Sequence, residues 1–297
     1  MIQGLTVHKH GLLRVIAGIP TEDAFASWEE GNLRAMSVAD GITRDCMNGK
    51  PLTRDWMGLV NARLFYPRNP NPAQAAANIF VESSLEALKS TIPIDETAVK
   101  LGFNYANLRI REWQRKYIRK VDYLANDFPG CVAALGIVDN RRGAFCWGQI
   151  CDAGVALLDE KGNLVMMTEN DGPEKHDAYI WNTDLMKGLN WKDNRARVNV
   201  RKVFRNNPHD EFHSGHTFGV LTGEEEALEY VRTGVQDFRP GYVAMAYTDG
   251  LEHVLFDRRD IRGNVVDAVR ARNWGGFRKA CKQGVETEGT VVYATGD

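Results

Sequence analysis

The chain has 297 residues, of which 43% are hydrophobic and 26% charged, a composition typical of a globular protein with a sizeable core. Its 37 basic and 39 acidic residues give a net charge of −2, which excludes a general attraction to nucleic acid or to an anionic membrane. No stretch approaches the roughly 20 apolar residues of a membrane span, and the first residues lack the apolar core of a secretion signal. We therefore expect a cytoplasmic protein, and we find no domain boundary between residues 1 and 297.

The cysteines point to the same compartment. They are odd in number and form no CxxC pair: Cys46, Cys131, Cys146, Cys151 and Cys281. Such a set predicts buried, reduced thiols rather than a disulfide framework. Reduced thiols are typical of the cytoplasm.

The first part of the chain predicts three strands, at residues 5–16, 24–28 and 33–39, with a hairpin turn at Gly31-Asn32 between the last two. Two acids, Glu22 and Asp23, stand just before the second strand, where a simple polar turn is the alternative interpretation. Asp40 and Gly41 follow the third strand directly.

An Asp-Gly pair at a strand end suits a hard cation. The sheet holds the carboxylate, and the glycine lets a backbone carbonyl approach a ligand, which matches the oxygen ligands that Mg²⁺ and Mn²⁺ prefer. A lone Asp-Gly pair is usually only a turn. Here the pattern recurs at Asp249, in AYTDGL at the end of another apolar run.

The middle of the chain changes from helices to strands. Apolar residues at helical spacing predict helices over residues 73–91 and 95–119. Short apolar runs at 131–139, 144–150, 155–159 and 164–168 then predict an antiparallel meander, with Asp152 between its second and third strands. Two amphipathic helices in this order are expected to cover one face of a sheet.

Residues 169–215 are polar and rich in basic side chains, and we expect a flap over a site, because long irregular segments in compact domains are usually functional or disordered. Its basic residues would suit a phosphorylated substrate, and a solvated surface loop is the alternative. A helix is expected at 224–233, a strand at 242–248, a helix at 265–272 and a closing strand at 289–294.

Three histidines of this region lie close together in HDEFHSGH: His209, His213 and His216. Their spacing is compatible with a metal-ligand set. Surface-loop histidines are the second interpretation, and a general acid for the leaving alkoxide is the third. The sequence leaves these three alternatives open.

The order of these motifs resembles the metal-dependent protein phosphatases of the type 2C kind. The similar segments are TEDAF at 21–25, VADG at 38–41, the helix pair, the meander at 131–170, AYTDGL at 246–251 and EGTVVYA at 288–294. The resemblance is colinear over nearly the whole chain. It implies an α+β fold, a four-layer αββα sandwich with two central antiparallel sheets flanked by helices.

The resemblance also implies a centre with two Mn²⁺ or Mg²⁺ ions. Asp40 would bridge the ions, with Asp249 on the first, the Gly41 carbonyl on the second, and Glu22 and Asp23 acting directly or through water. Asp152 falls where some members hold a third ion, and Glu288 would be the last ligand. A bridging water would attack phosphoserine or phosphothreonine, in a phosphoprotein or a small phosphoester, without a phosphoenzyme.

The sequence departs from the family pattern at two places. Gly18 stands where the family has a phosphate-binding arginine, and neither Arg14 nor Arg44 is in register to replace it. Thr287 stands where the family has its last aspartate, flanked by Glu286 and Glu288. These departures motivate an alternative, a catalytically weak phosphatase-like module that binds or regulates. A further alternative is a hydrolase with Cys151 as nucleophile.

Overall fold

The computed structural model describes residues 1–9, 21–42, 46–47, 50–51, 71–91, 93–117, 128–190, 193–256, 267–269, 271, 273–285 and 288–296. Gly18, Arg14, Arg44, Glu286 and Thr287, which carry the departures from the family pattern, lie outside these residues. Every helix within them is too short or too polar to cross a membrane.

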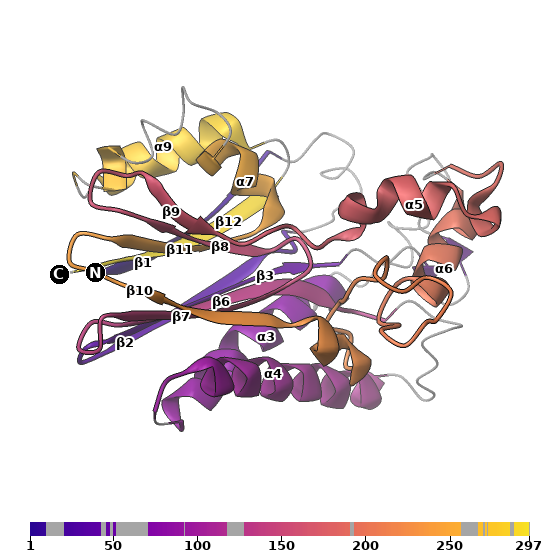
Figure 1. Cartoon of the computed structure of the whole chain (residues 1–297), viewed down its shortest axis with the longest axis horizontal. Coiled ribbons are helices and arrows are strands. Elements are labelled where there is room, and N and C mark those ends of the chain that lie inside the picture. The colour runs from indigo at the N-terminus through magenta and orange to yellow at the C-terminus, as the bar shows by residue number, and fades with distance from the viewer. Residues whose placement is uncertain are drawn as a thin grey trace.

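The described strands form two five-stranded antiparallel sheets, which are stacked face to face (Figure 1). The first sheet has the order β1 (Ile2–His8), β12 (Glu288–Thr295), β11 (Val243–Tyr247), β8 (Gly154–Leu158) and β9 (Leu164–Met167). The second has the order β10 (Arg232–Asp237), β7 (Ala144–Ile150), β6 (Cys131–Asp139), β3 (Leu33–Gly41) and β2 (Ala24–Glu30). A small ladder joins β4 (Cys46–Met47) to β5 (Lys50–Pro51).

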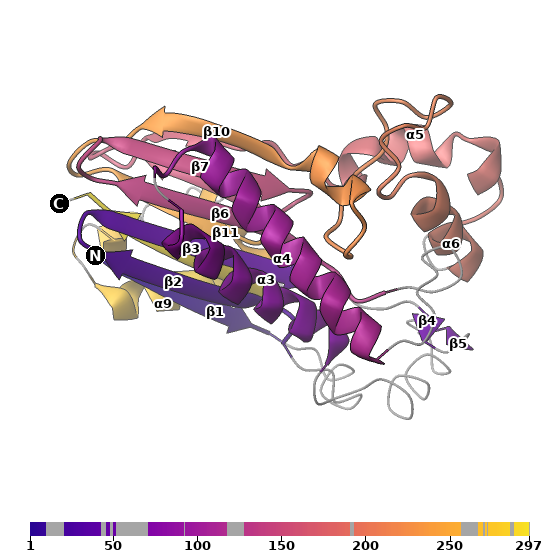
Figure 2. The ribbon, with the colours of Figure 1, turned by 90° about the horizontal axis from the view of Figure 1, so that it is seen from below.

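Helices cover the two outer faces. The helices α3 (Pro72–Lys89) and α4 (Glu96–Tyr117) lie across the second sheet, as seen from below in Figure 2. The helices α7 (Asp249–Phe256) and α9 (Trp274–Gly284) cover the first. The predicted αββα sandwich is therefore confirmed, with its two sheets in the centre and helices outside.

Local sequence explains the central layers. β6 is buried at every position, as expected for a central strand with apolar residues on both faces. Asn71 accepts a hydrogen bond from the Ala73 N–H, and Pro72 occupies the first turn, so the predicted start of α3 has both a cap and a proline. On α4 the apolar stripe of Val99, Phe103, Ala106 and Ile110 is buried against the second sheet.

Removal of Phe103 should be among the most damaging core substitutions. Its ring is fully buried and lies 5.1 Å from the Phe80 ring. It also packs against Gly148 of β7, where an added Cβ would come within 2.8 Å of the ring. We expect Phe103→Ala to lower the free energy of unfolding by about 3–5 kcal/mol. Leu101→Ala, on the exposed face of the same helix, is the control and should cost about 0.5 kcal/mol. Urea denaturation checks both, and equal losses would contradict this packing.

The helix predicted at 224–233 is wrong. Only η3 (Glu226–Tyr230) forms a short 3₁₀ turn, and the chain then continues into β10 at the edge of the second sheet. Pairing with β7 decides this, because Gly234 lies against the Trp147 ring, where a Cβ would come within 2.6 Å. A long-range pairing of this kind leaves no local pattern in the sequence.

Two other predictions near the chain ends shift. The first strand is Ile2–His8 rather than 5–16, and residues 10–16 lie outside the described part. The helix α9 has no counterpart among the predicted elements, and the predicted helix at 265–272 is described only in part, with residues 267–269 helical.

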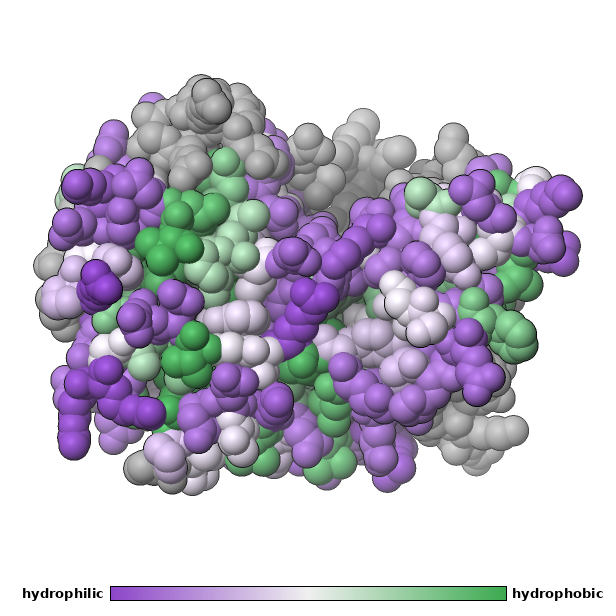
Figure 3. All heavy atoms as spheres, in the orientation of Figure 1, coloured by the Kyte–Doolittle hydropathy of each residue, from purple (hydrophilic) through white to green (hydrophobic). Residues whose placement is uncertain are grey.

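On the surface, Leu164, Val165 and Met167 of β9 are exposed at the edge of the first sheet, where hydrophobic side chains are visible in Figure 3.

The segment at 169–215 is more regular than predicted. It contains η1 (Pro173–His176), α5 (Asp177–Trp181), η2 (Asp184–Met186) and α6 (Asn194–Val203). These helices lie beyond one end of the two sheets (Figures 1 and 2). Ile180, Met186, Ala196 and Phe204 are buried and extend the hydrophobic cluster that lies between the sheets, which explains why these helices form despite their polar composition.

Candidate carboxylate site

Two strand pairings bring the predicted acids to one edge of the sandwich. Ala39 of β3 pairs with Ala24 of β2, so that Asp40 and Asp23 leave this pair at the same end. Tyr247 of β11 pairs with Gly154 of β8, and Asp249 and Asp152 each lie two residues beyond that pair. Each pairing places two aspartates at one end of a sheet, and the charges of Asp23, Asp249 and Asp152 act on Asp40, so all four lie at this edge.

Close backbone packing explains the glycines of both Asp-Gly pairs. A Cβ on Gly41 would lie 2.4 Å from the Ala73 carbonyl oxygen, and one on Gly250 would lie 1.7 Å from the Glu288 carbonyl oxygen. The Gly41 N–H also donates to the Glu22 carbonyl at 3.2 Å. The structure thus gives both glycines a packing role, while the predicted use of the Gly41 carbonyl as a metal ligand stays a prediction.

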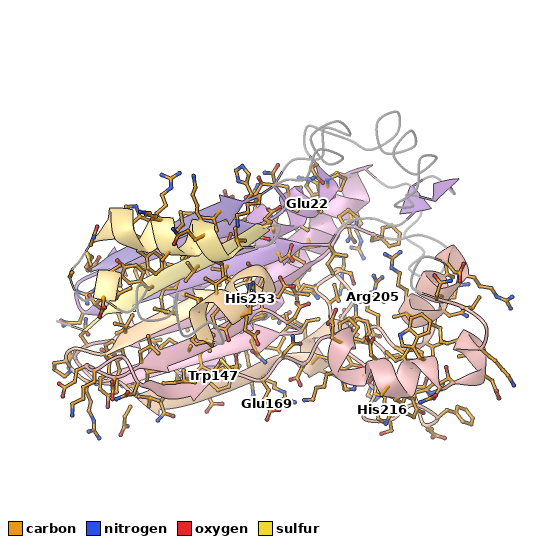
Figure 4. The ribbon with its side chains drawn as sticks, turned by 90° about the horizontal axis from the view of Figure 1, so that it is seen from above. Glu22, Trp147, Glu169, Arg205, His216 and His253 are labelled. Atoms are coloured by element: carbon orange, nitrogen blue, oxygen red, sulfur yellow. The ribbon has the colours of Figure 1, made fainter. Side chains whose placement is uncertain are left out.

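Glu288 lies at this edge and organises it. Its Oε1 accepts hydrogen bonds from the backbone N–H groups of Glu22 and Asp23, at 2.7 and 2.8 Å. The Thr248 hydroxyl donates to Asp23 Oδ2 at 2.8 Å, and the Asn71 side chain donates to Glu22 Oε1 at 3.2 Å. The start of β12, the chain before β2 and the start of α3 are therefore joined through carboxylates, and Figure 4 labels Glu22 at this end of the sheets.

The acids at this edge carry unfavourable charge. Burial is the main cause that raises the pKa of Asp40 well above its usual value, and repulsion from Asp23, Asp249 and Asp152 is the second. Burial and the Glu288 charge raise the pKa of Asp23 to about 7.

Asp152 also has a raised pKa, and one of its carboxylate oxygens lacks a hydrogen-bond partner among the described residues. Burial, together with the charges of Asp249 and Glu174, raises its pKa to about 8. Its Oδ1 is buried, and within the described part of the chain it accepts no hydrogen bond. A buried carboxylate oxygen without a donor requires a proton, a water or a cation.

The donor chemistry of this edge suits a divalent cation, although its side chains do not already enclose one. Oxygen ligands, shared negative charge and the Asp152 oxygen fit Mg²⁺ or Mn²⁺. Over the ranges that the structure describes, no three His, Cys, Asp or Glu side chains converge tightly enough to form a metal site as they stand. The carboxylates of Asp40, Asp152 and Asp249 are close enough to raise the pKa of Asp40 and Asp152, but they do not converge on one point.

Glu174 is an acid that the sequence reasoning did not select. It lies in η1, and its Oε2 and the Asp152 Cβ both come close to Gly172, at 2.8 and 3.2 Å from where a Cβ would stand. Burial raises the pKa of Glu174 as well. The Pro-Glu pair that starts η1 gives no signal for this position, because only the return of the chain after β9 brings it to Asp152.

The three histidines do not form a metal site. His209 lies 3.1 Å from Glu229, His216 stacks on the Tyr179 ring at 3.6 Å, and His213 makes a 3.1 Å hydrogen bond to the Tyr179 hydroxyl. Among the described residues no three His, Cys, Asp or Glu side chains are placed to hold a metal ion, which overturns the metal-ligand alternative.

The thiols are buried, as predicted. Cys131, Cys146, Cys151 and Cys281 are free and buried, and the side chain of Cys46 lies outside the described part. Burial and the Asp152 charge raise the pKa of Cys151 well above its usual value, whereas a nucleophilic cysteine needs a lowered pKa. The burial and the raised pKa of Cys151 both count against the cysteine-nucleophile alternative.

The raised pKa values predict that the metal-free chain loses stability as the pH rises. Unfolded carboxyl groups titrate near pH 4, whereas Asp23 and Asp152 titrate at about 7 and 8 when folded. Between these values the folded chain binds more protons than the unfolded chain, so the free energy of unfolding falls with increasing pH. We expect the melting temperature in EDTA to fall by roughly 10 °C or more between pH 5 and 8. Asp152→Asn should flatten this slope, and a wild-type melting temperature that rises over this range would contradict it.

Comparison with known proteins finds similarity in structure alone. No protein-family model matches the sequence, and no curated protein matches it. Among solved structures, a bacterial serine phosphatase that carries a point mutation superposes with a TM-score of 0.58 and 9% identity, covering 100% of this chain and 99% of that one.

Two further structures contain metal ions. The catalytic domain of the serine/threonine protein phosphatase PstP, in complex with two manganese ions, superposes with a TM-score of 0.52 and 14% identity, covering 100% of this chain and 99% of that one. RsbX in complex with magnesium superposes with a TM-score of 0.52 and 11% identity, covering 98% and 94%. The fold is that of the type 2C serine/threonine phosphatases, which confirms the resemblance at the level of the fold.

Proposed function

We propose that the chain is a metal-dependent phosphohydrolase that acts as a protein serine/threonine phosphatase. The observation that carries this proposal is the edge where Asp23, Asp152 and Asp249 lie close enough to Asp40 for their charges to raise its pKa. Structures of the same fold were solved with two manganese ions and with magnesium. A cluster of carboxylates of this kind is what a fold tolerates when a cation neutralises it.

Each described acid has a separate part in this proposal. Asp40, Asp152 and Asp249 would hold the cations, because their carboxylates interact with one another through repulsion that a cation would relieve. Bound cations would lower the pKa of water and neutralise a phosphate. Glu288 would fix the backbone of Glu22 and Asp23 and orient their carboxylates, in keeping with its two hydrogen bonds.

The segment at 169–215 would act as a flap of this single domain. It supplies Glu174 beside Asp152, and its helices lie beyond the same end of the sheets (Figure 1). Phosphoserine or phosphothreonine would enter between this segment and the carboxylate edge. We also propose a cytoplasmic location, which buried free thiols support.

One observation favours the second candidate, a phosphatase-like module with little catalytic activity. Glu288 already accepts two backbone hydrogen bonds, and within the described residues no tight set of three ligands exists. Such a module would keep the fold and, through a cation bound at the same edge, bind phosphorylated partners without hydrolysing them.

Hydrolysis measured against metal concentration separates the two candidates. The purified chain would be assayed on para-nitrophenyl phosphate and on a phosphothreonine peptide, in EDTA and with increasing Mn²⁺ or Mg²⁺. The phosphatase proposal expects turnover that appears with metal, disappears in EDTA and returns when metal is restored. Mn²⁺ binding by calorimetry without turnover would favour the binding module, and turnover that is unaffected by EDTA would overturn both.

A further inference from the structure

A polar pocket lies between α4, α6 and the residues that precede and begin η3, outside the carboxylate edge. Its volume is about 790 Å³, within the usual range for sites that bind small ligands or peptide side chains. Five basic side chains line it: Arg111, Arg115, Arg201, Lys202 and Arg205. We call this feature the α4–α6 pocket.

The pocket carries net positive charge in a chain that is slightly acidic overall. Five basic side chains face three acidic ones, Glu224, Glu225 and Glu226, which leaves +2 with His209 neutral. Within the pocket Glu224 accepts from the Asn206 amide at 2.8 Å and from Thr222, and Glu225 pairs with Arg111 at 2.9 Å, so these contacts leave the net charge of +2 unchanged. An anionic ligand would therefore meet a surplus of arginine and lysine.

The wall of the pocket that carries Arg205 is held in place by hydrogen bonds of its neighbour Asn206. Asn206 has a positive φ of 51°, and its side chain donates to Val220, Thr222 and Glu224 while accepting from the Val220 N–H at 2.7 Å. The buried Arg205 is held beside Phe218 by an isolated backbone β-bridge. Figure 4 labels Arg205 between the end of the sheets and α6. Fixed guanidinium groups are suited to recognise carboxylate or phosphate.

The pocket lies within peptide reach of the carboxylate edge. Gly41 pairs with Cys131, and Cys131 pairs in turn with Leu221, two residues before the pocket residue Gly223. Two strand spacings and two residues of chain place the pocket about 15–20 Å from Asp40. An extended peptide covers this distance in about four to six residues.

We propose that the α4–α6 pocket binds a second anionic group of the substrate, so that the chain prefers phosphopeptides with acidic residues four to six positions from the phosphorylated residue. The proposal rests on the proposed phosphatase function and specifies its substrate class. It also assigns a use to the basic residues of α6, which the carboxylate edge leaves without one.

Binding without hydrolysis tests this. Two fluorescein-labelled phosphothreonine peptides would be compared by anisotropy in EDTA, one with glutamates and one with glutamines at the fourth to sixth positions on both sides. We expect the wild-type chain to bind the glutamate peptide at least tenfold more tightly. Because EDTA removes any need for turnover, this outcome is independent of whether the chain proves to be a phosphatase.

Charge reversal at two exposed residues locates the effect. Arg115→Glu with Lys202→Glu, on opposite walls of the pocket, should abolish the preference, and the milder Arg115→Gln with Lys202→Gln should reduce it. Lys187→Glu, exposed in the same 169–215 segment but outside the pocket, should keep it. Equal binding of both peptides to the wild type, or an equal loss in Lys187→Glu, would overturn the proposal. Binding of ATP with the same dependence on Arg115 and Lys202, and without peptide preference, would also overturn it in favour of a nucleotide site.

Discussion

Asp40→Asn is expected to lower Mn²⁺-dependent hydrolysis of para-nitrophenyl phosphate at least about 1000-fold, which corresponds to about 4 kcal/mol of transition-state stabilisation. Asp40 lies at the end of β3, and the charges of Asp23, Asp249 and Asp152 all raise its pKa. It is therefore the central carboxylate of these four. Replacing it with an amide removes the charge at the centre of the proposed cation site with almost no change in shape. Steady-state kinetics at saturating Mn²⁺ measures the effect, and Asp249→Asn should follow the same trend.

Stability measurements distinguish lost chemistry from lost folding. Since Asp40 has a strongly raised pKa, its amide should leave the melting temperature of the metal-free protein unchanged or higher at pH 8. The matched control is Asp237→Asn, an exposed carboxylate at the far end of β10, which should keep full activity. Activity retained in Asp40→Asn, with normal dependence on Mn²⁺, would refute a cation site at this edge.

Gly250→Ala is expected to destabilise the fold by about 3 kcal/mol or more, although it adds a single methyl group. The new Cβ would stand 1.7 Å from the Glu288 carbonyl oxygen, a backbone atom that cannot rotate away. The first turn of α7 would have to separate from β12. Because Asp249 precedes this glycine and Glu288 supports Glu22 and Asp23, the same displacement should also weaken Mn²⁺ binding.

A second glycine provides the comparison. Gly275 lies in α9, where an added Cβ would meet only the Asn273 side chain at 3.7 Å. Gly275→Ala should therefore leave stability unchanged or raise it by up to about 1 kcal/mol, because alanine favours a helix more than glycine does. Urea denaturation and Mn²⁺ calorimetry of both variants test the argument. A Gly250→Ala protein as stable as Gly275→Ala would show that α7 and β12 do not approach as described.

Much of the candidate site could be predicted because its motifs are local. Asp40 and Asp249 follow apolar strands and precede glycines, and Asp152 interrupts a meander, so each shows its place in a few neighbouring residues. Glu288 could be proposed only by shifting the expected motif by one position. The structure places it at the edge, where its carboxylate holds two backbone N–H groups 265 and 266 residues earlier in the chain.

The sequence by itself determined the antiparallel strands and the two amphipathic helices α3 and α4, which local hydrophobic spacing indicates, and the αββα sandwich followed from the resemblance to the type 2C phosphatases. Only the tertiary structure decided that 232–237 is a strand, that Glu174 reaches Asp152, and that basic residues of α4 and α6 share one pocket. The physical reason is the same in each case. Edge pairing, buried charge and converging side chains depend on segments that are distant in sequence, and their energies exist only once the two sheets have formed.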